Sequence, residues 1–214
     1  LSGSQWVQRG VDIDGESASD YSGVSVDLSG DGKSLVVGAK GNDGNGSNAG
    51  HARVFDWSGS RWEQRGSDID GESSGDQSGS SATISNDGQT VVLGAPGNDG
   101  AGDNAGHARI YSWNGFQWGI QGTDVDGSAA NALNGTSVGV SSDGTRMVTG
   151  SPGADNSKGE AIVFQKKTLN NVNVIYNAAF ALDLIEDALT TLNKHRGDYG
   201  AMLSRMDHIT DNLT

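Results

Sequence analysis

The chain has 214 residues and a formal net charge of -13, with 34 glycines, two prolines and no cysteine. Its negative charge disfavours nucleic acids and anionic membranes as partners, and the lack of cysteine excludes disulfides and thiolate metal sites. No apolar run is long enough to span a membrane as a helix. Because valine, isoleucine and tryptophan recur regularly among the many glycines and serines, we expect a folded, turn-rich protein.

A repeat of 56 residues dominates most of the chain. Trp6, Trp62 and Trp118 are 56 residues apart, and the surrounding sequence repeats with them. The third copy departs from the pattern near its end, where Glu160 takes the place of a histidine. The sequence therefore predicts a β-repeat domain over residues 1–167, with copies at about 1–57, 58–113 and 114–167.

Each copy contains about four segments that are typical of short strands. In the first copy, Val24, Val26 and Leu28 alternate with polar residues, which indicates a half-buried strand. Residues 35–37 form an apolar run that suits an inner strand, and residues 30–32 read Gly-Asp-Gly, which favours a hairpin turn. Four short strands in a repeat of this length are typical of a propeller blade.

Two later segments extend this interpretation. Residues 91–96 read Val-Val-Leu-Gly-Ala-Pro, residues 147–152 read Met-Val-Thr-Gly-Ser-Pro, and each follows an Asp-Gly turn. In this they resemble the blade repeats of the integrin-type, or FG-GAP-like, β-propeller family. Three copies are fewer than the roughly four to eight blades of a closed ring. Either further blades precede Leu1, or the sheets stack in another way, as a solenoid or a sandwich.

The last segment, residues 168–214, has the periodicity of one long amphipathic helix, because its apolar residues recur mostly three and four positions apart. Such a helix would be about 70 Å long at roughly 1.5 Å per residue and would need partner helices. Gly197 and Gly200 either allow close helix packing or break the helix at Gly197. The expected fold class is mainly β: three tandem four-stranded, blade-like repeats in an incomplete ring or stacked sheets, followed by a long coiled-coil-type helix.

The stretch from about residue 180 to 214 resembles the conserved carboxy-terminal helix of bacterial flagellins. The resemblance rests on spaced residues near its end: Arg196, Gly200, Ala201, Arg205, Met206, Asn212 and Leu213. It implies that these residues pack in the core of the flagellar filament, against neighbouring subunits and an amino-terminal helix of the same chain. Because that amino-terminal helix is missing and the first residue is Leu1, we expect the chain to be a fragment.

Clustered acidic residues are the candidate ligands of a cation. The acidic segments of the three copies comprise Asp12, Asp14, Glu16, Asp68, Asp70, Glu72, Asp124 and Asp126. With the loops around Asp43 and Asp99, they offer the oxygen ligands that Ca2+ prefers. No stretch fits the full calcium-loop pattern, so we predict that these side chains cap turns, with no metal or other cofactor, and keep Ca2+ as the alternative.

The remaining chemistry-bearing residues suggest structural roles. His51 and His107 occupy equivalent positions in their copies, each at a strand start, and we interpret both as structural. The tryptophans at the repeat ends either fill space between blades, the favoured interpretation, or line a sugar-binding surface. No Ser-His-Asp arrangement or phosphate loop distinguishes itself, so we do not expect an enzyme.

The leading hypothesis is a structural subunit, or a fragment of one, of the extracellular bacterial flagellar filament. The helix would lie in the filament core, and the repeats would be exposed on its surface. Its partners would be other copies of the chain and the missing amino-terminal helix, with no nucleic acid and no membrane. The alternative is a secreted, calcium-stabilised β-propeller module for binding or adhesion, in which the helix serves to form oligomers.

Overall fold

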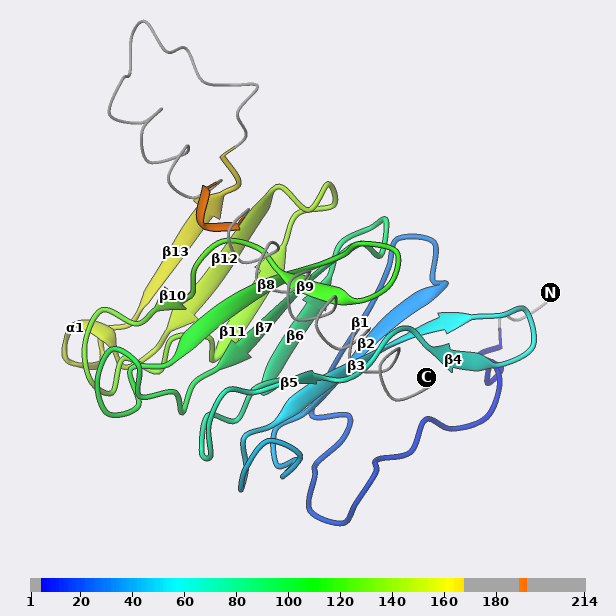
Figure 1. Ribbon diagram of the computed structural model, residues 1–214, viewed down its shortest axis with the longest axis horizontal. Coiled ribbons are helices and arrows are strands. Elements are labelled where there is room, and N and C mark those ends of the chain that lie inside the picture. Colours follow the sequence, from blue (N-terminus) through cyan, green and yellow to red (C-terminus); the bar gives the residue numbers. More distant parts are fainter. Residues whose placement is uncertain (1–4, 168–188, 192–214) are drawn as a thin grey trace, which may run out of the picture. The chain divides into compact units, whose positions relative to one another are not determined.

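The computed structural model describes residues 5–167 and 189–191. The chain divides into two compact units, residues 1–165 and 166–214, and the fold described below is that of the first. Three antiparallel sheets follow one another along the chain. Figure 1 shows them side by side in chain order, from the blue and cyan strands of the first sheet to the yellow strands of the third.

The first two sheets have the same five-stranded arrangement. The first contains β1 (Ser25–Leu28), β2 (Ser34–Ala39), β3 (His51–Trp57), β4 (Trp62–Gln64) and β5 (Ile69–Asp70). The second contains β6 (Ser81–Ile84), β7 (Thr90–Ala95), β8 (His107–Trp113), β9 (Trp118–Ile120) and β10 (Val125–Asp126). The third contains β11 (Ser137–Val140), β12 (Arg146–Ser151) and β13 (Glu160–Gln165). In every sheet, three consecutive strands form an antiparallel meander. In the first two sheets, the third strand of the meander also pairs with two short strands that follow it in the chain.

The edge strands of each five-stranded sheet come from the next copy of the repeat. β4 and β5 belong to the second copy in sequence, yet both pair with β3 of the first. In the same way, β9 and β10 of the third copy pair with β8. Each sheet is therefore completed by residues of the following copy, which ties successive copies together through backbone hydrogen bonds.

The predicted hairpin turns are confirmed. β1 and β2 pair around the turn that contains Asp31, whose carboxylate accepts hydrogen bonds from the Ser29 hydroxyl and the Lys33 amide, both at 2.9 Å. Gly32 has a φ of 63°, a conformation that residues with a Cβ adopt at a cost. Asp87 and Asp143 hold the equivalent turns of the other copies. Local turn chemistry therefore fixes the register of all three hairpins.

Neighbouring sheets meet along their first strands. The Gly30 amide donates to the Asn86 carbonyl at 3.0 Å, and the Asn86 amide donates to the Ser142 carbonyl at 3.1 Å, so the three equivalent turns form a continuous chain of hydrogen bonds. A Cβ on Gly38 would lie 2.1 Å from the Gly79 carbonyl oxygen, which explains why this position is glycine. The sheets are thus packed backbone against backbone at this edge.

The hydrophobic core fills the spaces between sheets. Between the first and second sheets it contains Val36, Val54, Ile84, Val91 and Leu93, all at most 5% exposed. A second cluster centres on Val92, Ala108 and Met147, between the second and third sheets. Burying each valine or leucine contributes roughly 1.5 to 3 kcal/mol, so these layers stabilise the packing of successive sheets.

The expected fold class is wrong in its helical part. Among the described residues the helices are single turns, α1 (Ala154–Ser157) and residues 189–191, and none of the described helices is long enough or apolar enough to cross a membrane. The rest of the predicted coiled-coil-type helix, residues 168–188 and 192–214, lies outside the described residues. Apolar spacing identifies the face that a helix would bury, but a long helix also needs a partner that covers this face, and spacing does not supply one.

Candidate functional site

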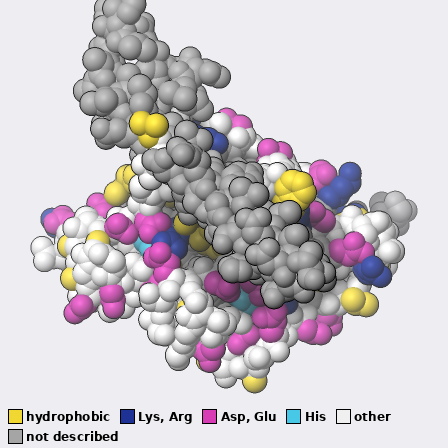
Figure 2. Space-filling model, in the orientation of Figure 1, with side chains coloured by type: hydrophobic (Ala, Val, Ile, Leu, Met, Phe, Trp, Pro, Cys, Tyr) yellow, Lys and Arg dark blue, Asp and Glu magenta, His cyan; other side chains and the backbone are white. Residues whose placement is uncertain are grey.

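Two equivalent clusters of ionisable side chains occur in the described part of the chain. Each contains a glutamate, a histidine and an aspartate: Glu16, His51 and Asp68 in the first cluster, and Glu72, His107 and Asp124 in the second. In each cluster, one potential ligand atom from every residue lies within 4.8 Å of the others. Figure 2 shows two places on the face toward the viewer where histidine is visible among acidic side chains.

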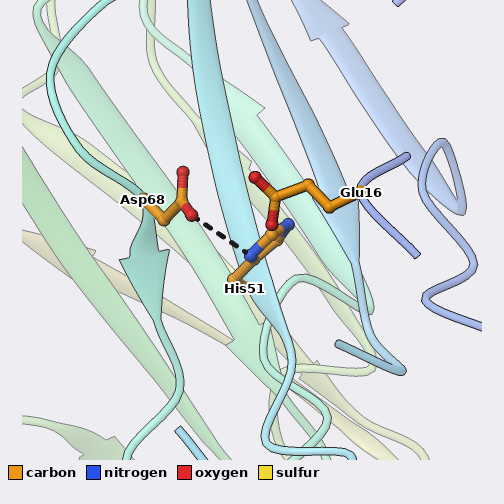
Figure 3. A group of neighbouring side chains, drawn as sticks. All are labelled: Glu16, His51 and Asp68. Carbon is orange, nitrogen blue, oxygen red and sulfur yellow. Dashed lines mark ion pairs between the residues drawn. The ribbon is translucent and has the colours of Figure 1, made fainter. Parts of the chain in front are cut away.

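The first cluster lies where two copies of the repeat meet. His51 begins β3, Asp68 directly precedes β5, and β5 pairs with β3 through the partners His51 and Asp70. Glu16 comes from the loop that precedes β1. Figure 3 shows the carboxylates of Glu16 and Asp68 beside the imidazole of His51, with the ion pair between Asp68 and His51 marked. The pairing of β5 with β3 across the copy boundary therefore assembles the cluster.

The buried His51 imidazole lacks a hydrogen-bond partner at one nitrogen. His51 is 1% exposed, and its Nδ1 atom forms no hydrogen bond. The Asp68 Oδ2 oxygen lies 3.8 Å from this nitrogen, which is too far for a hydrogen bond. A buried polar atom without a partner costs roughly 1 to 3 kcal/mol, so this nitrogen requires an explanation.

The carboxylates of the first cluster are only loosely engaged by Arg53. The Arg53 Nη2 atom donates to the backbone carbonyl of Asp14 at 2.6 Å, while its Nη1 atom is 3.7 Å from Glu16. Asp68 instead accepts a hydrogen bond at 2.7 Å from the Gln64 amide through its Oδ1 oxygen. Its second oxygen, Oδ2, is left facing His51.

The second cluster differs because an arginine binds its carboxylates. Arg109 donates from Nε and Nη2 to the two oxygens of Asp124, both at 2.7 Å, and its Nη2 atom also pairs with Glu72. These hydrogen bonds outweigh the burial that opposes its charge and raise the pKa of Arg109; the hydrogen bonds from Arg109 lower the pKa of Asp124. The position equivalent to Gln64 is Ile120, which cannot donate a hydrogen bond to Asp124.

His107 has the same orphaned nitrogen. It is 3% exposed, and its Nδ1 atom is buried without a partner. Burial lowers the pKa of His107, and the adjacent Arg109 lowers it further, so the imidazole is neutral at pH 7. The second cluster is thus a neutral imidazole beside an ion pair that is already satisfied.

The acidic loops that suggested Ca2+ hold turns with their carboxylates. The Asp43 Oδ1 oxygen accepts a hydrogen bond from the Asn48 amide at 2.7 Å, and Asp99 accepts one from the Asn104 amide at the same distance. Asp12 accepts a hydrogen bond from the side chain of Gln8 at 2.7 Å. These contacts are those of turn-capping side chains. That these loops hold no metal stays a prediction, and Ca2+ binding stays the alternative to it.

The tryptophans pair across hairpins. The rings of Trp57 and Trp62 lie 5.3 Å apart, with the Arg9 guanidinium 4.5 Å from the Trp57 ring. The Trp113 and Trp118 rings repeat this arrangement at 5.4 Å, with the guanidinium of Arg65 5.0 Å from Trp118. The indole nitrogens of Trp62 and Trp118 donate to the carbonyls of Arg9 and Arg65, each at 3.0 Å. These contacts make a structural clasp between the outer strand of one sheet and the preceding copy.

A hollow of about 420 Å3 lies beside the first sheet. Its lining includes Tyr21, Lys40, Asn48 and Gln77. Tyr21 is 63% exposed, and the Lys40 ammonium lies 5.8 Å from its ring. An exposed aromatic ring beside two amides and an ammonium group suits a polar ligand that has one flat apolar face.

The residues predicted to pack between subunits cannot be placed. All seven lie outside the described residues: Arg196, Gly200, Ala201, Arg205, Met206, Asn212 and Leu213. They stay a prediction from the resemblance alone.

Comparison with protein families supports one of the two predicted resemblances, that to FG-GAP repeats. A family model described as FG-GAP repeat matches residues 11–55, which is most of the first copy. The predicted resemblance of the repeats to FG-GAP blades is confirmed over this range, whereas flagellin finds no support. A search of curated proteins returns no match to the sequence.

Several solved structures are similar to the chain at low identity. They include hydrazine synthase of Kuenenia stuttgartiensis, with a TM-score of 0.44, 15% identity, and coverage of 66% of this chain and 33% of that one. The periplasmic gluconolactonase PpgL of Pseudomonas aeruginosa has a TM-score of 0.40 and 15% identity, with coverage of 66% and 38%. The chain therefore spans about a third of the length of these proteins. Likeness at this level carries no argument about its activity.

The two Glu-His-Asp clusters are not predicted from the sequence. From the sequence, His51 is expected to have only a structural role, and Glu16 and Asp68 fall in separate acidic segments. One signal could have found them, because all three residue types recur after 56 residues. What was missing is the pairing of β5 with β3, which brings the second copy's aspartate to the first copy's histidine.

Proposed function

We propose that the chain is a β-propeller-type binding or adhesion module that acts outside the cell and is not an enzyme. The observation that carries the proposal is the FG-GAP repeat match over residues 11–55, in a chain that repeats the same sheet. Blades of this kind present loops on a rigid scaffold, an arrangement that favours recognition of a ligand. The net charge of -13 and the lack of cysteine accord with a soluble module that needs no reducing compartment.

The hollow beside Tyr21 is the proposed ligand-binding surface. The Tyr21 ring offers a flat apolar face, and the amides of Asn48 and Gln77 offer both donors and acceptors. Lys40 adds a positive charge to this surface, in a chain whose formal net charge is -13. This combination favours a carbohydrate, or a protein loop that carries hydroxyl or carboxylate groups.

A binding screen tests the proposal. The full chain is presented to immobilised glycans and extracellular proteins, and affinities are then measured for the ligands found. Tyr21→Ala is expected to weaken binding about tenfold or more, because it removes the central aromatic contact. Phe116→Ala is the matched control, because Phe116 is an aromatic residue that is 89% exposed in a different turn. No ligand above background would overturn the module, and equal binding by Tyr21→Ala would overturn the assigned surface.

Calcium stabilisation belongs to the same proposal. The acidic loops around Asp43 and Asp99 offer carboxylate and carbonyl oxygens, which are the ligands of Ca2+. If calcium binds the folded chain, its melting temperature rises with calcium concentration and falls again in chelator. A melting temperature that is identical in calcium and in chelator would remove calcium from the proposal and leave the binding surface at Tyr21 unaffected.

A further inference from the structure

We infer that the cluster of Glu16, His51 and Asp68 binds a divalent transition-metal ion of the Zn2+ type, and that Arg109 closes the equivalent second cluster to it. The inference goes beyond the proposed binding function, because it concerns the junction between copies and not the hollow at Tyr21. It rests on the spacing of the ligand atoms, the orphaned imidazole nitrogen and the different positions of the two arginines.

The spacing of the ligand atoms suits a shared ion. Zn2+ binds histidine nitrogen and carboxylate oxygen at about 2.0 to 2.2 Å, so two ligands of one ion are at most about 4.2 Å apart. The His51 Nδ1 and Asp68 Oδ2 atoms are 3.8 Å apart, which is too long for a hydrogen bond but within this limit. Glu16, within 4.8 Å of both, has a side chain that is 44% exposed and can rotate to complete the set.

The ion accounts for the nitrogen that has no partner. The Nδ1 atom of His51 is buried, faces the Asp68 carboxylate at 3.8 Å and forms no hydrogen bond. A neutral imidazole nitrogen is a good ligand for zinc and similar ions, whereas Ca2+ prefers oxygen ligands alone. One imidazole and two carboxylates leave a coordination position open for water.

Neighbouring side chains of the first cluster orient its carboxylates. Gln64 donates to the Oδ1 oxygen of Asp68, which holds the carboxylate so that Oδ2 faces His51. Such outer contacts commonly fix metal ligands. Arg53 lies beside this cluster, and its contact with the Asp14 carbonyl at 2.6 Å is shorter than its ion pair with Glu16 at 3.7 Å. Two negative charges are therefore available for a divalent cation.

The second cluster has the same ligand types but no free oxygen pair. Arg109 occupies both oxygens of Asp124 and also pairs with Glu72, so a positive charge already fills the position that an ion would take. A cation would have to displace this half-buried arginine from two carboxylates. Of the two clusters in the described part of the chain, only the first is therefore expected to hold an ion.

Zinc titration of the full chain by calorimetry tests the inference, and the repeat supplies its own control. We expect one tight zinc site, which His51→Ala weakens about a hundredfold or more and His107→Ala leaves unchanged. Arg109→Gln should add a second site, and this site should disappear again in the double variant Arg109→Gln with His107→Ala. If His51→Ala does not fold, as judged by circular dichroism, Asp68→Asn removes one ligand oxygen with little change of shape, and the same loss is expected.

The inference has two parts, the metal site and the role of Arg109, and different results of the titration would overturn each. The metal site is overturned if the wild type does not bind zinc. It is also overturned if His51→Ala or a folded Asp68→Asn variant binds zinc as tightly as the wild type. Two equal sites in the wild type, or no gain in Arg109→Gln, overturns the role of Arg109. Because no ligand of the Tyr21 hollow is present in this titration, its failure leaves the proposed binding function untouched.

Discussion

The first two copies of the repeat and the third share a backbone but differ in their buried polar groups. Asp20 and Asp76 are buried, and each accepts a hydrogen bond from a buried asparagine of the same copy, at 3.0 and 3.1 Å respectively. In the third copy, the aspartate position is Ala132 and the asparagine position is Ala154, both buried. Both partners have therefore changed together from polar to apolar.

Other linked groups change in the same way. The third copy has Gln121 where the first two have the arginine of the tryptophan clasp, and Ser128 where they have the glutamate of the cluster. Glu160 stands in place of the histidine and accepts a hydrogen bond from Ser128 at 3.3 Å. The comparison shows that the polar residues form sets that are kept or replaced together.

The largest effect is expected from separating the buried pair of the second copy. Asp76→Ala leaves the amide of Asn98 buried without its partner, and we expect a loss of about 1 to 3 kcal/mol in the free energy of unfolding. The double variant with Asn98→Ala reproduces the alanine pair of the third copy and should lose less than the sum of the single variants. Urea unfolding of the four proteins measures the coupling. Strictly additive losses would show that the two side chains are independent.

A smaller effect is expected from converting the second clasp to the third copy's sequence. Arg65→Gln removes a guanidinium that lies 5.7 Å from the Trp113 ring and 5.0 Å from the Trp118 ring and donates to the Gly88 carbonyl at 2.7 Å. We expect the free energy of unfolding to fall by about 1 to 2 kcal/mol. Tryptophan fluorescence recorded during unfolding measures this loss. Arg9→Gln is the matched control in the first copy. Because Arg9 is exposed and Arg65 is half-buried, Arg9→Gln should cost less, and the reverse order would contradict the clasp.

The smallest effect concerns a turn that all three copies keep. The hydrogen bonds from Ser141 and Thr145 lower the pKa of Asp143 to about 2. In the unfolded chain this carboxyl titrates near 3.8, so the unfolded state binds the proton first as the pH falls. The stabilisation is present above pH 4 and is lost between about pH 4 and pH 2. Asp143→Asn should therefore lower the melting temperature slightly at pH 7, and the difference should vanish near pH 2. A difference that persists at pH 2 would exclude the ionised carboxylate as its cause.

Local chemistry explains what the sequence predicted well. The hairpin around Asp31 follows from turn residues between two strand-like segments, and the 56-residue repeat multiplies this one prediction into three. The clusters could not be predicted in this way. Glu16, His51 and Asp68 are distant in sequence and meet only because β5 pairs with β3 of the preceding copy. The long helix was inferred from spacing alone, and spacing does not establish the partner on which such a helix depends.

The claim that the junction of the first two copies holds a metal ion is tested most directly by anomalous X-ray diffraction at the zinc absorption edge, on crystals of the zinc-loaded full chain. The predicted result is one zinc peak at bonding distance from the His51 Nδ1 atom and from carboxylate oxygens of Glu16 and Asp68, with no peak beside His107. A peak beside His107, or none at His51, would contradict the account.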